Sequence, residues 1–209
     1  MKLSAPLVTS ASTFAVALSL LTVPAVAAPP PPPTLSTARI QLKGLTVAPA
    51  DSMAGFKRDL FPHWDRVEGR CDTREIVLRR DGQDVVADNE CRAVRGEWHS
   101  PYDGETWTDA ADIDIDHMVP LAEAWRSGAA DWSTQRRRTF ANDLDTSQLW
   151  AVTDNVNQAK SDKDPGVWKP PQRSFHCTYA RSWIEVKNEY GLSVDSAEKA
   201  ALEEMLDRC

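Results

Sequence analysis

The pattern of hydrophobic and polar residues predicts many short elements rather than a few long ones. Helices are predicted within 56–64, ending near Pro62, and at 121–127, 136–144, 154–160, 179–190 and from Asp195 to Cys209. Strands are predicted at 75–78, 84–87, 112–117 and 149–152, the first two forming a hairpin around Asp81-Gly82. Helices outnumber strands, so we expect an α+β fold with a small antiparallel sheet.

The N-terminus has the pattern of an export signal. Lys2 precedes an apolar run at 14–23, and Ala25-Val26-Ala27 supplies a small-x-small cleavage pattern. The alternative is a single membrane anchor. Prolines directly after the apolar run disfavour it. We therefore assign 1–27 to a signal peptide, 28–40 to a Pro-rich linker and 41–209 to the domain, and expect a secreted protein with no membrane attachment after cleavage.

Secretion changes how the four cysteines are interpreted. An even set in an oxidising compartment predicts disulfides, and four cysteines allow three pairings. We favour the pairing of nearest neighbours, Cys71 with Cys91 and Cys177 with Cys209. The alternative, a zinc site of four thiolates, lacks the usual C-x2-C spacing and needs reduced thiols outside the cell.

Composition and charge limit the classes of function. The 209 residues are 42% hydrophobic and 26% charged, which suits one domain with a real core and excludes collagen-like and multi-pass membrane proteins. The formal net charge is −7, whereas proteins that bind nucleic acid through its phosphates are usually basic. After the predicted signal peptide, only the segment 126–173, with the run Arg136-Arg137-Arg138, has more basic than acidic residues. A polyanion would therefore have to bind at this segment.

Candidate chemistry begins at the end of the predicted strand 112–117. Its alternation places Ile113 and Ile115 inward and the aspartates outward, and a solvated strand face accounts for Asp112 and Asp114. Asp116 and His117 pair an oxygen ligand with an imidazole suited to general-base catalysis. Side chains at neighbouring strand positions point to opposite faces, so Asp116 and His117 can serve one site only if the chain turns at this point. Pro120, three residues later, favours such a turn.

A second stretch of interest begins some thirty residues later, at Gln148. After the strand 149–152, a helix carries Asn157 and Lys160 at i and i+3, which places both on one helix face. A carboxylate and an imidazole, followed by a strand and a helix with an amide, give the layout of a ββα-metal nuclease site.

These residues resemble a known family. The stretches DIDHMVPLAEAW at 114–125 and NQAKSDKDP at 157–165 are similar to HNH endonucleases, in particular to the secreted branch related to the C-terminal domain of GmrSD-type restriction endonucleases. The likeness extends more loosely to 71–74, to 96–104 and to the C-terminal helices. The resemblance implies a ββα-metal (HNH) motif within the α+β fold.

The resemblance also implies a role for each site residue. His117 would be the general base, Asp116 and Asn157 would hold one divalent cation, most simply Mg²⁺ or Mn²⁺, and Lys160 would lie near the phosphate. Where the family has an asparagine that orients the histidine, this chain has Gln148, whose amide reaches one methylene farther. The products implied are 5′-phosphate and 3′-hydroxyl ends.

The leading hypothesis is therefore a secreted, metal-dependent endonuclease whose substrate is nucleic acid, most simply DNA. One alternative is a non-catalytic extracellular binding domain on an HNH-like fold, which the acidic charge and Gln148 favour. Another is a metal-dependent hydrolase that acts on a different phosphodiester.

Overall fold

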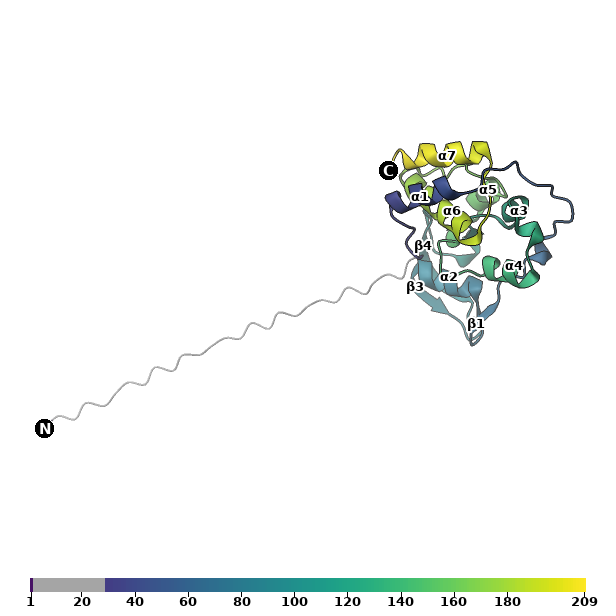
Figure 1. Cartoon of the computed structure of the whole chain (residues 1–209). Helices are drawn as coiled ribbons and strands as arrows, with labels where there is room; N and C mark the ends of the chain where they lie inside the picture. The colour runs from purple at the N-terminus through teal and green to yellow at the C-terminus, as the bar shows by residue number, and fades with distance from the viewer. Residues whose placement is uncertain (2–28) are drawn as a thin grey trace.

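The computed structural model describes Met1 and residues 29–209, so the predicted signal peptide lies, apart from Met1, outside the described residues (Figure 1). The described part of the segment predicted as a linker, 29–40, is not extended throughout. From Leu35 it forms helix α1 (Leu35–Gly44), whose Ala38 is fully buried, and the predicted domain boundary lies inside this helix. The prolines before it also contact the domain, because Arg181 donates to the carbonyl of Pro33 (2.7 Å).

The described residues form seven α-helices and seven short strands. The helices after α1 are α2 (Thr73–Asp81), α3 (Leu121–Arg126), α4 (Thr134–Ala141), α5 (Asp154–Lys160), α6 (His176–Tyr190) and α7 (Ser196–Leu206). The strands are β1 (Arg66–Glu68), β2 (Cys71–Asp72), β3 (Gly82–Ala87), β4 (Ala93–His99), β5 (Thr106–Trp107), β6 (Ile113–His117) and β7 (Leu149–Thr153). None of these helices has both the length and the apolar character needed to cross a membrane.

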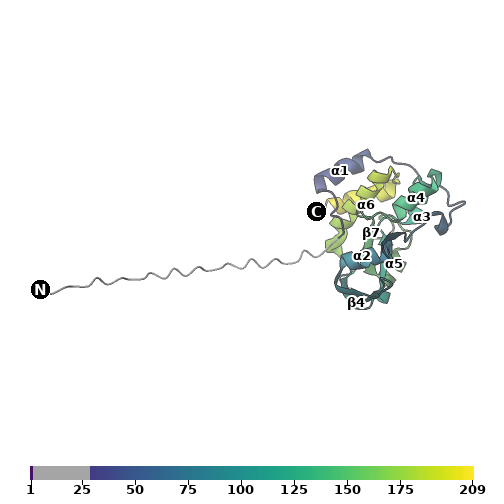
Figure 2. The ribbon, with the colours of Figure 1, turned by 90° about the horizontal axis from the view of Figure 1, so that it is seen from below.

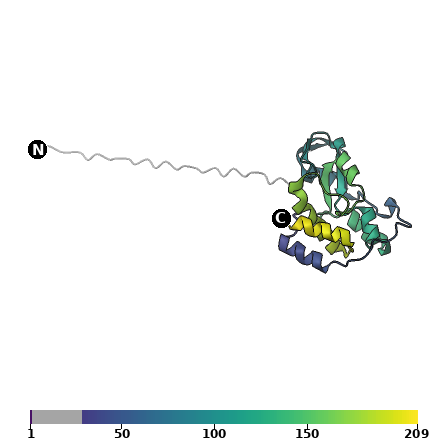
Figure 3. The same ribbon diagram turned by 90° about the horizontal axis from the view of Figure 1, so that it is seen from above.

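The strands form three small antiparallel sheets: β1 with β2, β3-β4-β5, and β6 with β7. The predicted α+β class is confirmed, with three small sheets in place of one. Helices α1, α6 and α7 pack together at one end of the molecule, and α2 lies with β3 and β4 at the other (Figure 1). Seen from above, α1 in purple and α7 in yellow lie side by side (Figure 3).

The β6–β7 pair separates two hydrophobic cores. Alternate residues of the pair, including Ile115 and Leu149, face a smaller core around Trp98. The residues of β7 that point to the opposite face, Trp150 and Val152, belong to the larger core, which is formed mainly by the helices. Helix α5 follows β7 directly and contacts both strands (Figure 2), which gives two antiparallel strands and a helix in chain order.

Several predicted helix ends are confirmed, because local chemistry fixes them. Pro120 is the N-cap of α3, a position that suits its fixed φ. Gly191 ends α6 in the left-handed conformation, with φ of 62°. Asp195 and Glu198 form a capping box at the start of α7, where the sequence predicts that a helix begins.

The strand predicted at 75–78 is wrong, because these residues lie in helix α2. The side chain of Asp72 accepts from the main chain of Glu75, and Glu75 accepts in return from Asp72, so a capping box starts a helix here. Both Val77 and Leu78 are still fully buried, now from one side of a helix. The predicted hairpin is also shifted, since β3 pairs with β4 on the far side of Cys91.

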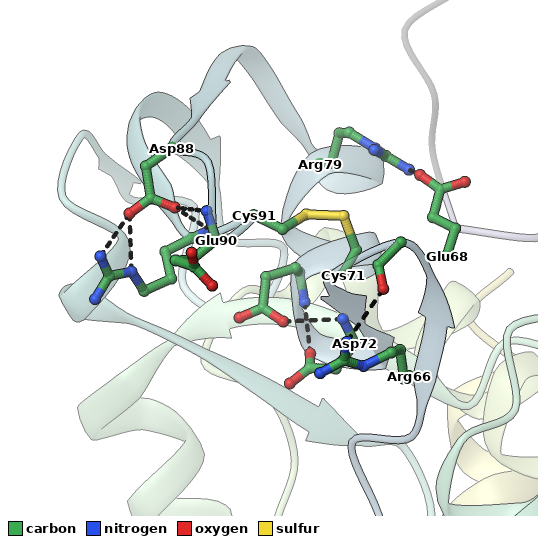
Figure 4. The surroundings of a disulfide bond; sticks show 11 residues. Arg66, Glu68, Cys71, Asp72, Arg79, Asp88, Glu90 and Cys91 are labelled. Atoms are coloured by element: carbon green, nitrogen blue, oxygen red, sulfur yellow. Dashed lines mark hydrogen bonds and ion pairs between the residues drawn. A yellow bond between two sulfur atoms is a disulfide. The ribbon is translucent and has the colours of Figure 1, made fainter.

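The predicted disulfides Cys71–Cys91 and Cys177–Cys209 are both present, which excludes the zinc alternative for these four cysteines. Figure 4 shows how the first joins β2 to the turn between β3 and β4. Around it, Asp88 accepts from Arg92, and Arg79 pairs with Glu68. The second ties the C-terminus to the first turn of α6.

Candidate active site

A cavity of about 420 Å³ lies where β6 ends beside helix α5, and three predicted site residues line it. Asp116 and His117 come from the end of β6, and Asn157 comes from α5. The other polar side chains that line it are those of Arg58, Gln158, Ser161 and Asp162. The remaining predicted residues, Gln148 and Lys160, lie behind this wall and are fully buried.

The ring of His117 is held in one orientation. Its Nε2 lies 2.9 Å from the carbonyl oxygen of Ala141, and a carbonyl only accepts, so Nε2 carries the hydrogen. Burial lowers the pKa of His117 to about 3, and the positive charge of Arg58 also lowers it, against the opposing effect of the Ala141 hydrogen bond. The imidazole is therefore neutral, with the lone pair on Nδ1.

Asp116 is almost completely buried, at 5% exposure, and both of its oxygens accept hydrogen bonds. Lys160 Nζ lies 2.9 Å from the carboxylate, and the hydroxyl of Tyr102 donates to Oδ2. Burial raises the pKa of the Asp116 carboxyl, while Lys160 and Tyr102 act in the opposite direction. Asp116 is thus a buried carboxylate with its own counter-ion.

Lys160 therefore does not lie where the resemblance places it. Its amine is fully buried and donates to Asp116 and to the backbone carbonyl of His117, each at 2.9 Å. In this position it holds two neighbouring residues of the site in place and has no access to a phosphate in the cavity.

The two aspartates that precede Asp116 are both half-buried, so neither lies on the fully solvated face that the sequence predicts. Asp112 comes just before β6, and Asp114 lies within it. Helix α5 covers this face of the strand at Asp114, and Asn157 Nδ2 donates to Asp114 Oδ2 (3.0 Å). This contact uses the amide nitrogen of Asn157 and leaves its oxygen for another partner.

Gln148 contacts the chain just after His117 rather than the imidazole. Its Oε1 accepts from the main-chain N–H of Val119 and its Nε2 donates to the carbonyl of the same residue, both at 3.1 Å. The main chain of Gln148 also accepts from Met118 (2.7 Å). The longer amide thus fixes the turn that follows the histidine, while the carbonyl of Ala141 orients the ring itself.

The donor set of the cavity fits the divalent cation that the resemblance implies. Asp116 and Asn157 offer a carboxylate and an amide oxygen, the donor types that Mg²⁺ and Mn²⁺ prefer. A carboxylate has about four lone-pair sites, so Asp116 keeps capacity beyond its two hydrogen bonds. Across residues 29–209, no group of three or more His, Cys, Asp or Glu is placed to hold a metal. The fit is therefore to a cation with few protein ligands and several waters.

Four residues of this site were not predicted from the sequence. Tyr102 lies in a stretch that carries the family likeness, but Arg58, Trp64 and Ala141 have no local signal. The Trp64 ring stacks on His117, with ring centroids 5.7 Å apart and an interplanar angle of 28°. Conversely, the basic run at 136–138 does not line the cavity, and the buried Arg137 donates to main-chain carbonyls.

Comparisons with known proteins bear on what this site does. A family model described as "GmrSD restriction endonucleases, C-terminal domain" matches residues 73–205. A protein of Arthroderma benhamiae named "Uncharacterized secreted protein" is 58% identical over 201 residues, which cover 94% of this chain and 98% of the relative. No solved structure matches. The prediction of secretion is confirmed by this relative and agrees with the two disulfides.

Proposed function

The chain belongs to the family of the C-terminal domain of GmrSD restriction endonucleases, and on this premise we propose that it is a secreted, metal-dependent endonuclease that hydrolyses phosphodiester bonds in DNA. One observation carries the proposal. Asp116, His117 and Asn157 come from two stretches about forty residues apart and line one cavity, in which His117 is neutral and held at Nε2. The β6–β7–α5 unit that carries them is, in this proposal, the ββα-metal motif.

The general base in this mechanism is Nδ1 of His117. A water molecule attacks phosphorus, Nδ1 takes the proton of that water, and the bond from phosphorus to the 3′-oxygen breaks. The leaving 3′-oxygen takes a proton from solvent, so the products have 5′-phosphate and 3′-hydroxyl ends. Ala141 keeps the hydrogen on Nε2, which leaves Nδ1 free to accept.

Asp116 and Asn157 would hold the divalent cation. When bound, the cation would supply positive charge opposite the charge that develops on the phosphate oxygens and on the leaving oxygen. Lys160 and Gln148 act as positioning residues: Lys160 holds Asp116 and the His117 carbonyl, and Gln148 holds the turn at Val119.

The test is cleavage of supercoiled plasmid by the purified, oxidised protein with Mg²⁺ or Mn²⁺, with and without chelator. We expect cleavage that chelator stops and added cation restores. His117→Ala should lower the rate by roughly 10²–10⁴, the usual contribution of a positioned base. Asn157→Ala, at a half-buried position, should also lose activity and keep the fold.

The matched control is His99→Ala. His99 is exposed on β4, where it contacts Thr106, and does not line the cavity, so this variant should cleave like the parent. A His117→Ala protein that folds and cleaves normally would refute the assignment of the base. Binding of DNA without cleavage under all metal conditions would favour the non-catalytic alternative.

A further inference from the structure

Part of the cavity wall comes from outside the stretch that the family model matches. That match begins at residue 73, yet Phe56 and Arg58 line the cavity together with Asp116 and His117. We call residues 46–64 the N-terminal segment. Trp64, at its end, stacks on the His117 ring. The site is thus enclosed by residues that the family domain alone does not supply.

The N-terminal segment is attached to the rest of the chain near both of its ends. Hydrogen bonds join Ala48 N to Val194 O (3.0 Å), Asp51 N to Arg126 O (2.8 Å), Arg137 Nε to Leu60 O (3.0 Å) and Asn142 Nδ2 to Pro62 O (2.9 Å). Trp64 has φ of 60°, which is unfavourable for a large residue and persists only where surrounding contacts impose it. The segment therefore has a defined position beside the site.

The charges around the cavity make Arg58 distinctive. Within the described residues, it is the only lysine or arginine that lines the cavity. The two carboxylates of the lining have their own partners, since Asp116 pairs with Lys160 (2.9 Å) and Asp162 pairs with Arg126 (2.6 Å). Arg58 is exposed, and no ion pair found within residues 29–209 includes it. An accessible cation therefore faces the same space as the general base.

We propose that Arg58 binds the scissile phosphate, the position that the family resemblance assigns to Lys160. This inference rests on the proposed nuclease function. A guanidinium donates two parallel N–H groups to two phosphate oxygens, which fixes the phosphate as well as attracting it. The phosphate would then lie between Arg58 and the side of the cavity formed by Asp116, His117 and Asn157.

The test compares Arg58→Gln and Arg58→Lys with Lys57→Gln. Lys57 is the matched control, because it is the preceding residue, is exposed and does not line the cavity. Arg58 is exposed and makes no ion pair with the residues that the structure describes, so its variants should fold. Two measurements are made: plasmid cleavage at saturating DNA with Mg²⁺, and anisotropy of a fluorescein-labelled DNA duplex in EDTA at several salt concentrations.

Arg58→Gln should lower cleavage at saturating DNA by roughly 10²-fold, the scale for removing one donor to a developing charge. In EDTA, it should lower the slope of log affinity against log salt by about one, as loss of one phosphate contact does. Arg58→Lys should be intermediate, since it keeps the charge and loses the second N–H. Lys57→Gln should cleave normally at saturating DNA.

Two results separate this inference from the proposed function. If His117→Ala loses cleavage but Arg58→Gln cleaves like Lys57→Gln at saturating DNA, the nuclease function stands and the role of Arg58 is refuted. If the wild type does not cleave, the proposed function fails. The binding measurement in EDTA then decides by itself whether Arg58 contacts a phosphate. An unchanged salt slope in Arg58→Gln then refutes the phosphate contact, and a reduced slope supports it.

Discussion

Replacing Lys160 by methionine removes the counter-ion of a buried carboxylate. In the native structure, Nζ lies 2.9 Å from Asp116 and 2.9 Å from the His117 carbonyl, and the Lys160 and Asp116 side chains are 0% and 6% exposed. Methionine has a similar length and no charge. In the variant, the Asp116 carboxylate keeps only the hydroxyl of Tyr102 as a partner.

The expected loss of unfolding free energy is about 3–5 kcal/mol, the cost of breaking a buried ion pair by removing one partner. Asp116 would respond by holding a proton, because burial already raises its pKa and the main opposing charge is gone. A carboxyl whose pKa is raised in the folded state stabilises that state most at pH values below its unfolded-state pKa. This stabilisation is lost as pH rises through the folded-state pKa. The deficit of the variant should therefore be smaller near pH 4 than at pH 7.

The measurement is urea unfolding followed by tryptophan fluorescence, with the disulfides oxidised. Lys163→Met is the control, since Lys163 is exposed and its change should stay within about 0.5 kcal/mol. Adding Asp116→Asn to Lys160→Met removes the unpaired charge and should recover much of the loss. A loss of unfolding free energy below about 1 kcal/mol in Lys160→Met would be typical of an exposed contact. Together with reduced cleavage, it would favour the role near the phosphate that the resemblance implies for Lys160.

Three further predictions concern parts of the fold that support the site. Burial raises the pKa of Glu198 from 4.5 to about 7. The unfolding free energy should therefore fall as pH rises from about 4.5 to 7, on the order of 1 kcal/mol per pH unit. Urea titrations of Glu198→Gln should show a flatter profile of unfolding free energy against pH. Gln148→Leu leaves the N–H and C=O of Val119 unpaired and should cost about 1–3 kcal/mol for each group in urea unfolding; an unchanged midpoint would contradict this reasoning. Replacing Cys177 and Cys209 by serine should lower unfolding free energy by about 2–4 kcal/mol, seen as a lower Tm than that of the oxidised parent.

The sequence predicted those elements whose ends depend on nearby residues. Pro120, Gly191 and the pair Asp195 and Glu198 set helix ends through their own backbone or through side chains three residues away. The strand prediction at 75–78 failed for a related reason. Four mostly apolar residues fit a strand or a helix equally, and the capping box at Asp72 decides between them.

In the candidate site, too, the residues could be predicted from local signals and their contacts could not. Asp116, His117 and Asn157 were identified from residue type and spacing, and β6, β7 and α5 bring them to one cavity. The surroundings of Lys160 were not predictable, because its i+3 spacing from Asn157 fixes a helix face and not what that face meets. Pairing with Asp116 results from how α5 packs on β6.

Secretion, the α+β class and the presence of disulfides could be predicted from the sequence, since each depends on composition or on short-range patterns. Of the three possible disulfide pairings, the sequence only favoured the one that the structure shows. Three features of the site arise from tertiary packing instead: Arg58 lines the cavity, Trp64 stacks on His117 and the Ala141 carbonyl fixes the ring. These contacts join segments 24 to 59 residues apart. No local pattern encodes such a contact, because it exists only after the two hydrophobic cores have packed.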